Sequence, residues 1–192
     1  VVYDFLDPYF AMVINELHEL AHAQNYSVLL VGFLNRQPKD SDLLPLYKHS
    51  VDGIVILGSY GDLSWTDAFK ETPIARIGHG THPNLTLAIG IDEQDAMRKI
   101  FGHLAKDLGL KKIAYASREL AAHHMRRDAA EEAAKFFGCD YSCLPVSSET
   151  SDFKAGTNIA RALMDKGREN LPQAIVCATD TIAMGIIKRF YE

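Results

Sequence analysis

One short stretch of the chain matches a catalytic zinc motif. Residues 18–22, His-Glu-Leu-Ala-His, have the spacing that, on a helix, puts two imidazoles on one face with a glutamate general base beside them. A zinc site of this kind needs a third ligand from a downstream helix. Here the helix is predicted to end near Gln24, and an apolar strand is predicted from Tyr26. We therefore predict exposed histidines, no metal site and no catalytic residue, and keep a zinc hydrolase as a competing hypothesis.

Other patterns that carry catalysis or bind a cofactor are missing from the sequence. No Gly-x-Gly-x-x-Gly or phosphate-binding loop follows a predicted strand, and there is no nucleophile elbow or Cys–His pair at a fixed spacing. Cys139, Cys143 and Cys177 make an odd number of cysteines, which fits reduced thiols in a cytoplasm. We predict a cytoplasmic protein that is not an enzyme and uses no cofactor.

Two aromatic residues, Tyr9 and Phe10, open the first predicted helix. They follow Pro8, which suits a first helical turn, and they come directly after the first predicted strand. Ligands of parallel α/β sheets bind at the carboxyl ends of the strands, and an aromatic ring there can stack on the apolar face of a sugar. The same rings could instead pack the helix start onto the core, so both readings stay open.

Apolar strands alternate with helices along the chain. Strands are predicted at 1–3, 26–33, 53–58, 74–77, 85–91, 111–116, 140–144 and 174–178, and helices at 8–24, 39–49, 62–70, 92–107, 125–137, 152–166 and 181–190. Strands as apolar as Val51–Leu57 are covered on both faces, which predicts an α/β fold with parallel sheets. The alternation restarts after Leu108, so we predict two lobes, 1–108 and 109–192.

Charge and hydropathy exclude two kinds of partner. The net charge of −5 gives the 192 residues no basic surface for nucleic acid or an anionic membrane. No apolar run approaches the roughly 20 residues that span a bilayer. We expect this chain by itself to bind neither DNA nor a membrane.

Several motifs follow one another in the order and spacing of a known family. Asp7-Pro8-Tyr9-Phe10 is similar to an Asn-Pro-aromatic-aromatic turn, and residues 51–55 to a Val-Asp-Gly-Ile-Ile strand. Residues 91–96 resemble Val-Asp-Asn-x-x-Gly, 108–113 resemble Leu-Gly-His-Arg-x-Ile, and 174–185 resemble an Ala-Ile-Phe strand followed by Asn-Asp. Arg126 fits an Arg-x-x-Gly-Phe-x-x-Ala helix. Together these motifs resemble the effector-binding core of the LacI/GalR transcriptional regulators, across essentially the whole chain.

The resemblance implies a two-lobed, type I periplasmic-binding-protein-like fold with an effector site in the cleft between the lobes. The positions that match effector-binding positions of the family are Tyr9, Phe10, Asp95, Arg126, Phe153, Thr179 and Asp180. Other roles remain open for several of them. Asp95 could favour the positive end of its helix, Arg126 could be an exposed helix cation, and Thr179 or Asp180 could cap a helix.

Some residues depart from the family pattern near the cleft. Gly78 stands where an aspartate is usual, and Thr179 where an asparagine is usual; Ser50, Ala96, Ala129 and Ala130 also differ. These departures leave the identity of the effector open.

From the resemblance we expect the sensing domain of a bacterial regulator, with a sugar as the effector. The family's DNA-binding helix-turn-helix is expected to be absent from this chain and the second lobe to be incomplete, so operator DNA would be bound only through that missing segment. The resemblance further implies a homodimer in which effector binding controls DNA binding allosterically. A periplasmic sugar-binding protein of a transport system is the alternative, because it shares the fold.

Overall fold

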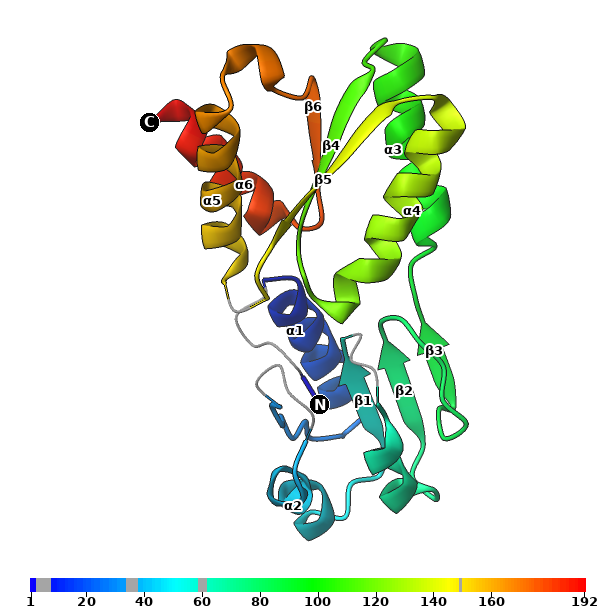
Figure 1. The fold of residues 1–192 in the computed structure, drawn as a ribbon. Helices are drawn as coiled ribbons and strands as arrows, with labels where there is room; N and C mark the ends of the chain where they lie inside the picture. Colours follow the sequence, from blue (N-terminus) through cyan, green and yellow to red (C-terminus); the bar gives the residue numbers. More distant parts are fainter. Residues whose placement is uncertain (3–7, 34–37, 59–61, 149) are drawn as a thin grey trace. The chain divides into compact units, whose positions relative to one another are not determined.

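The structure is a computed structural model that describes residues 1–2, 8–33, 38–58, 62–148 and 150–192 (Figure 1). Tyr3 of the first predicted strand and Asp7 of the aromatic turn lie outside these residues. The chain forms two compact units, Val1–Ile91 and Asp92–Glu192. This boundary differs from the predicted one at 108–109 because the intervening helix buries Met97 and Phe101 in the core of the second unit.

Parallel strands build the sheet of the first unit. Its strands pair in the order β1-β2-β3, with β1 at Ile54–Leu57, β2 at Ile74–Ile77 and β3 at Leu87–Ile89. The helices are α1 (Pro8–Ala23) and α2 (Asp40–Lys48), and a 3₁₀ helix covers Ser64–Phe69. These elements confirm the predicted helices at 8–24 and 39–49 and the predicted strands at 53–58 and 74–77.

The apolar segment 26–33 does not form the strand that was predicted. Val2 bridges Gly32 on one side and Leu57 on the other, so the sheet extends past β1 only by single bridges. Residues 26–30 pair with no strand among the described residues. Tyr26 and Val28 are consequently exposed.

The second unit also has a parallel sheet, and helices cover both of its faces. Its strands pair in the order β5-β4-β6, at Asp140–Val146, Lys112–Arg118 and Ala174–Cys177. Figure 1 shows α3 (Glu93–Gly102) and α4 (Ala121–Phe137) on one face, and α5 (Asp152–Asp165) and α6 (Asp180–Tyr191) on the other. One π-helical turn, His103–Asp107, continues α3, and a 3₁₀ turn follows α5 at Arg168–Asn170. The predicted α/β class with parallel sheets is confirmed.

Small residues let the helices of the second unit pack closely. Ala129, Ala130, Ala133 and Ala134 are buried where α4 covers the sheet. On the other face, a Cβ atom on Gly156 of α5 would overlap the carbonyl oxygen of Ile182. In the same way, a Cβ on Gly185 of α6 would overlap the carbonyl oxygen of Phe153. Alanine and glycine at these positions therefore set how near the helices come to the sheet and to each other.

Among the described residues, no helix is both long enough and apolar enough to cross a lipid bilayer.

Candidate functional site

The carboxyl edge of the second unit's sheet is the candidate functional site. β4 lies between β5 and β6, so the chain moves from β4 to one side and later returns to the other. Parallel sheets bind ligands outside the carboxyl ends of their strands, at the point where the strand order reverses. Arg118 ends β4 at this point, and Ala178 and Thr179 follow β6.

Arg126, on the second turn of α4, is held by two other elements. Its Nε and Nη2 donate to the two carboxylate oxygens of Glu93, at 2.9 and 2.7 Å. Its Nη1 donates to the carbonyl oxygen of Ala178, at 2.5 Å. The Glu93 side chain is only 5% exposed, and its hydrogen bonds raise the pKa of Arg126. The two-pronged contact fixes the plane of the guanidinium at the end of β6.

A second ion pair lies at the end of β4. Arg118 Nη1 donates to Asp152 Oδ1 at 2.8 Å, and its Nη2 donates to the carbonyl oxygen of Ser148. The Thr179 hydroxyl donates to Asp152 Oδ2 at 2.6 Å and accepts the N–H of Ile182, which caps α6. One carboxylate thus joins the ends of β4 and β6 to the start of α5.

His123 is buried near both ion pairs. The helix predicted from residue 125 begins earlier, at Ala121, so His123 lies in the first turn of α4. The residue is 8% exposed, and this burial lowers the pKa of the imidazole. The charges of Asp152, Arg126 and Arg118 also act on this pKa. Its Nδ1 has no hydrogen-bond partner within the described part of the chain.

Asp95 and Asp180, two of the predicted effector-binding residues, are exposed near helix starts. The Asp95 carboxylate pairs with Lys99 on its own helix at 2.6 Å, while Asp92 caps α3 by accepting the Asp95 N–H. Asp180 is the first residue of α6. Of the pair at 179–180, Thr179 is therefore the helix cap and Asp180 is the exposed carboxylate.

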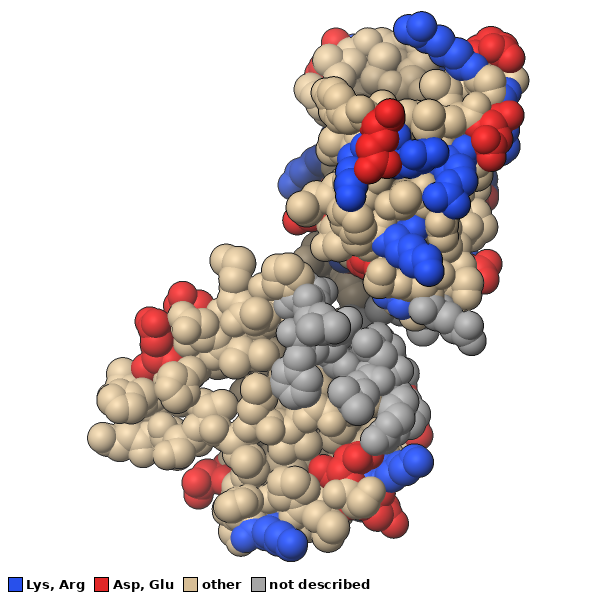
Figure 2. Space-filling view, turned by 90° about the vertical axis from the view of Figure 1, so that its left-hand side faces the viewer, with Lys and Arg blue, Asp and Glu red and all other residues tan. Residues whose placement is uncertain are grey.

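Phe153 is the second residue of α5 and directly follows Asp152. Its ring is 38% exposed and has Lys188 Nζ 5.7 Å from its centroid. With Lys154, Arg161 and Lys188 it lines a hollow of about 350 Å³ between α5 and α6. Figure 2 shows basic side chains gathered over this part of the second unit. The ring of Phe153 therefore lies beside α6, and its predicted contact with effector stays a prediction.

Tyr9 and Phe10 begin α1 in the first unit. Their ring centroids are 5.4 Å apart with the planes tilted by 59°, and Tyr9 is half exposed. Within the part of the unit that the structure describes, neither residue belongs to the buried hydrophobic core. Their predicted contact with effector stays a prediction.

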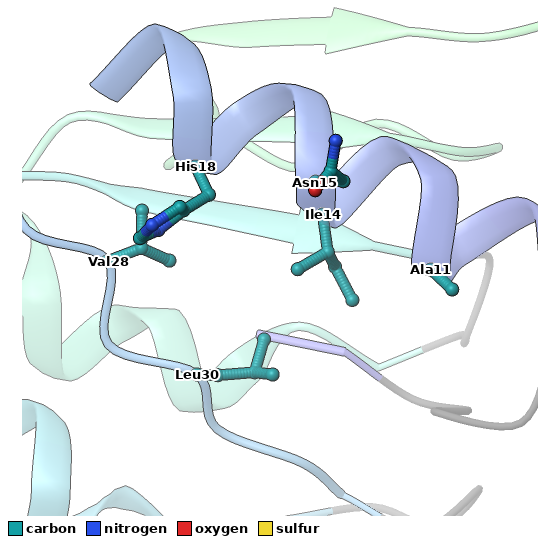
Figure 3. Close-up of a pocket in the computed structure, with 6 residues that line it drawn as sticks. All are labelled: Ala11, Ile14, Asn15, His18, Val28 and Leu30. Carbon is teal, nitrogen blue, oxygen red and sulfur yellow. The ribbon is translucent and has the colours of Figure 1, made fainter. Parts of the chain in front are cut away.

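The zinc-like motif lies beside an apolar hollow of the first unit. His18 and His22 are exposed, and Glu19 accepts a hydrogen bond from Asn15. Figure 3 shows His18 turned toward Val28 across this hollow of about 380 Å³, which is lined by Ala11, Ile14, Asn15, His18, Val28 and Leu30. No cluster of three or more His, Cys, Asp or Glu side chains suited to a metal occurs among the described residues.

Sequence reasoning missed Glu93, Arg118 and Asp152 as members of the site. Arg118 and Asp152 each carry a simple signal: a charged residue directly after an apolar strand, and an acidic residue at the start of a predicted helix. Glu93 carries none, because its partner Arg126 is 33 residues away and the two meet only when α3 packs on α4.

Comparisons with known proteins agree with this architecture. The sequence model of the family described as "Periplasmic binding proteins and sugar binding domain of LacI family" matches residues 1–190. No curated protein matches the chain.

Solved structures with a similar fold include several regulators. A LacI transcriptional regulator from a Rhodococcus species has a TM-score of 0.80 at 19% identity, covering 99% of this chain and 70% of its own. A LacI family regulator from Lactobacillus casei with bound sucrose has a TM-score of 0.82 at 17% identity, with 99% and 71% covered. The Cra transcriptional dual regulator from Pseudomonas putida, in complex with fructose 1-phosphate, has a TM-score of 0.80 at 19% identity, with 99% and 72% covered.

Proposed function

Because the chain belongs to the family of periplasmic binding proteins and sugar-binding domains of the LacI family, we propose that it is the effector-binding domain of a LacI-type transcriptional regulator. Family membership confirms the resemblance seen in the sequence. The regulators among the proteins of similar fold support this proposal over a transport protein.

The observation that carries the proposal is the preassembled polar edge at β4 and β6. Two guanidinium groups, two carboxylates and a hydroxyl converge there, and ion pairs already fix their orientation. Such a set of fixed donors and acceptors suits the hydroxyl groups of a sugar, because binding then needs little reordering of side chains.

The proposed role of the sugar is regulatory. A sugar held at this edge, with Tyr9, Phe10, Asp95, Phe153 and Asp180 as further candidate contacts, favours one arrangement of the two units. That bias passes through a cytoplasmic homodimer to a helix-turn-helix joined to this domain in the full protein, and so controls operator binding. None of these steps requires the domain to touch DNA.

A thermal-shift screen of mono- and disaccharides tests the proposal. A sugar that binds the folded state alone raises the apparent melting temperature, and calorimetry then gives its affinity. We expect at least one sugar to bind and Arg126→Lys to weaken it by about tenfold or more, because lysine keeps the charge beside Glu93 and loses the two-pronged geometry.

Arg127→Lys is the matched control, since Arg127 is the next residue on α4 and forms an ion pair with its exposed neighbour Asp128. It should leave sugar affinity unchanged. If no sugar raised the melting temperature, or if both variants weakened binding equally, the proposed function would be wrong.

A further inference from the structure

Resting on the proposed function, we infer that the effector is an uncharged sugar, not a sugar phosphate or a sugar acid, and that Glu93 sets this preference. The inference concerns the charge balance at the carboxyl edge of the second unit. Sugar phosphates and sugar acids need an uncompensated cation, whereas neutral sugars need hydroxyl partners.

Each arginine at this edge already has its own carboxylate. Arg126 is bound through both prongs by Glu93, and Arg118 is bound by Asp152, whose second oxygen accepts from Thr179. Their positive charges are thus compensated before any ligand arrives. The exposed Asp180 adds a further negative charge next to Thr179.

An anionic ligand would either have to separate one of these ion pairs or bind beside both of them, and both options are unfavourable. The Glu93 side chain is 5% exposed, and Asp152 is 21% exposed. Taking Arg126 away from Glu93 would leave a buried carboxylate without its counter-ion, which is strongly unfavourable. If both pairs stayed intact, the ligand's anion would instead face the carboxylates across a short distance, and like charges in that position repel.

A neutral sugar meets neither obstacle. A guanidinium has five N–H groups, more than Arg126 and Arg118 each use in bonds to the carboxylates and carbonyl oxygens described above. Hydroxyl oxygens can therefore accept from the remaining N–H groups while the ion pairs persist. His123, near both pairs, keeps an unused Nδ1, and burial lowers its pKa, so it brings no compensating charge at about pH 7.

Calorimetry with matched ligand pairs tests the inference on the intact chain. The pairs are glucose with glucose 6-phosphate, fructose with fructose 1-phosphate, and sucrose with sucrose 6-phosphate; gluconate serves as a sugar acid beside glucose. We expect the neutral member of a binding pair to bind at least about tenfold more tightly than its phosphate.

Glu93→Gln isolates the residue responsible. Glutamine keeps an oxygen that can accept from Arg126 but leaves the guanidinium charge uncompensated, so the ratio of neutral to phosphate affinity should fall by about tenfold. Glu131→Gln, which removes a carboxylate that pairs with Lys135 on α4, is the matched control and should leave the ratio unchanged.

The outcomes separate this inference from the proposed function. Tighter binding of a phosphate by the unsubstituted protein would overturn the charge argument while leaving a sugar-binding domain in place. An unchanged ratio in Glu93→Gln would overturn the role of Glu93 alone. Should the variant fail to fold, the ratio in the unsubstituted protein still decides the charge argument. If neither member of any pair bound, the proposed function would fail, and this inference with it.

Discussion

At the scale of single residues, burial decides how the candidate site responds to pH. His123 is 8% exposed, and desolvation lowers the pKa of its imidazole below the usual 6.5. The unfolded chain therefore takes up a proton at a higher pH than the folded chain does. Stability should be unaffected by this group well above pH 6.5 and should fall as the pH drops below it. The loss cannot exceed about 1.4 kcal/mol per pH unit for one proton.

The variant His123→Gln should remove this part of the pH dependence. Glutamine offers an amide nitrogen that can take over the imidazole's hydrogen bond to the backbone of Arg118, but it does not titrate. Urea unfolding of both proteins at about pH 7.5 and about pH 5.5 measures the effect. We expect a smaller loss of unfolding free energy in the variant. His22→Gln, at an exposed position, is the control; an equal loss in all three proteins would contradict the assignment.

At the scale of elements, the contact between α5 and α6 depends on two glycines that have no room for a side chain. A Cβ on Gly156 would overlap the backbone of α6, and backbone atoms cannot swing aside as a flexible side chain can. Gly156→Ala should therefore lower the unfolding free energy by about 1–3 kcal/mol or more, despite alanine's better helix propensity. Urea denaturation followed by circular dichroism measures the change.

Gly53→Ala is the matched control for this substitution. A Cβ at Gly53 would lie 3.6 Å from the carbonyl oxygen of Pro73, an ordinary contact distance. That variant should keep its urea midpoint or gain slightly, since alanine restricts the unfolded chain more than glycine does. A Gly156→Ala protein as stable as the Gly53→Ala protein would mean that α5 and α6 are further apart in solution.

Some strands of this fold could be predicted from the sequence, and one predicted strand does not form. The strands predicted from apolar runs at β4, β5 and β6 do form, because each of them has a parallel partner within the chain. The equally apolar segment 26–33 makes only one bridge among the described residues, between Gly32 and Val2, and its apolar pattern alone does not reveal this. Hydrophobic periodicity reports what a segment can bury, and pairing depends on which neighbours it has.

Some residues of the candidate site could likewise be predicted from the sequence, and others could not. Arg126 and Thr179 were found through the resemblance, and the structure places both at the carboxyl edge of the second unit. Glu93, which holds Arg126, was missed because the pair spans two helices that meet only in the folded unit. Residues that act through a distant partner leave no spacing signal in the sequence.

At the scale of the whole molecule, the two units differ in how completely their sheets are paired and buried. β4 has strands on both sides, and Ile113, Ala114, Tyr115 and Ala116 are each 0% exposed. In the first unit, residues 27–30 donate no backbone hydrogen bond to any described residue. Protection from exchange with solvent should therefore be very uneven along the chain.

Hydrogen exchange measured by mass spectrometry tests this expectation. Peptides from β4 should retain their amide protons until the second unit unfolds, whereas a peptide covering 27–30 should exchange in the earliest time points. β1 is the internal control, because it belongs to the same unit as 27–30 but pairs with β2 over its whole length. If 27–30 were as protected as β1, the segment would be paired in solution, and the exposed apolar surface at Val28 and Leu30 would be covered. If β1 exchanged as fast as 27–30, fast exchange would be a property of the whole first unit and not of the unpaired segment 27–30.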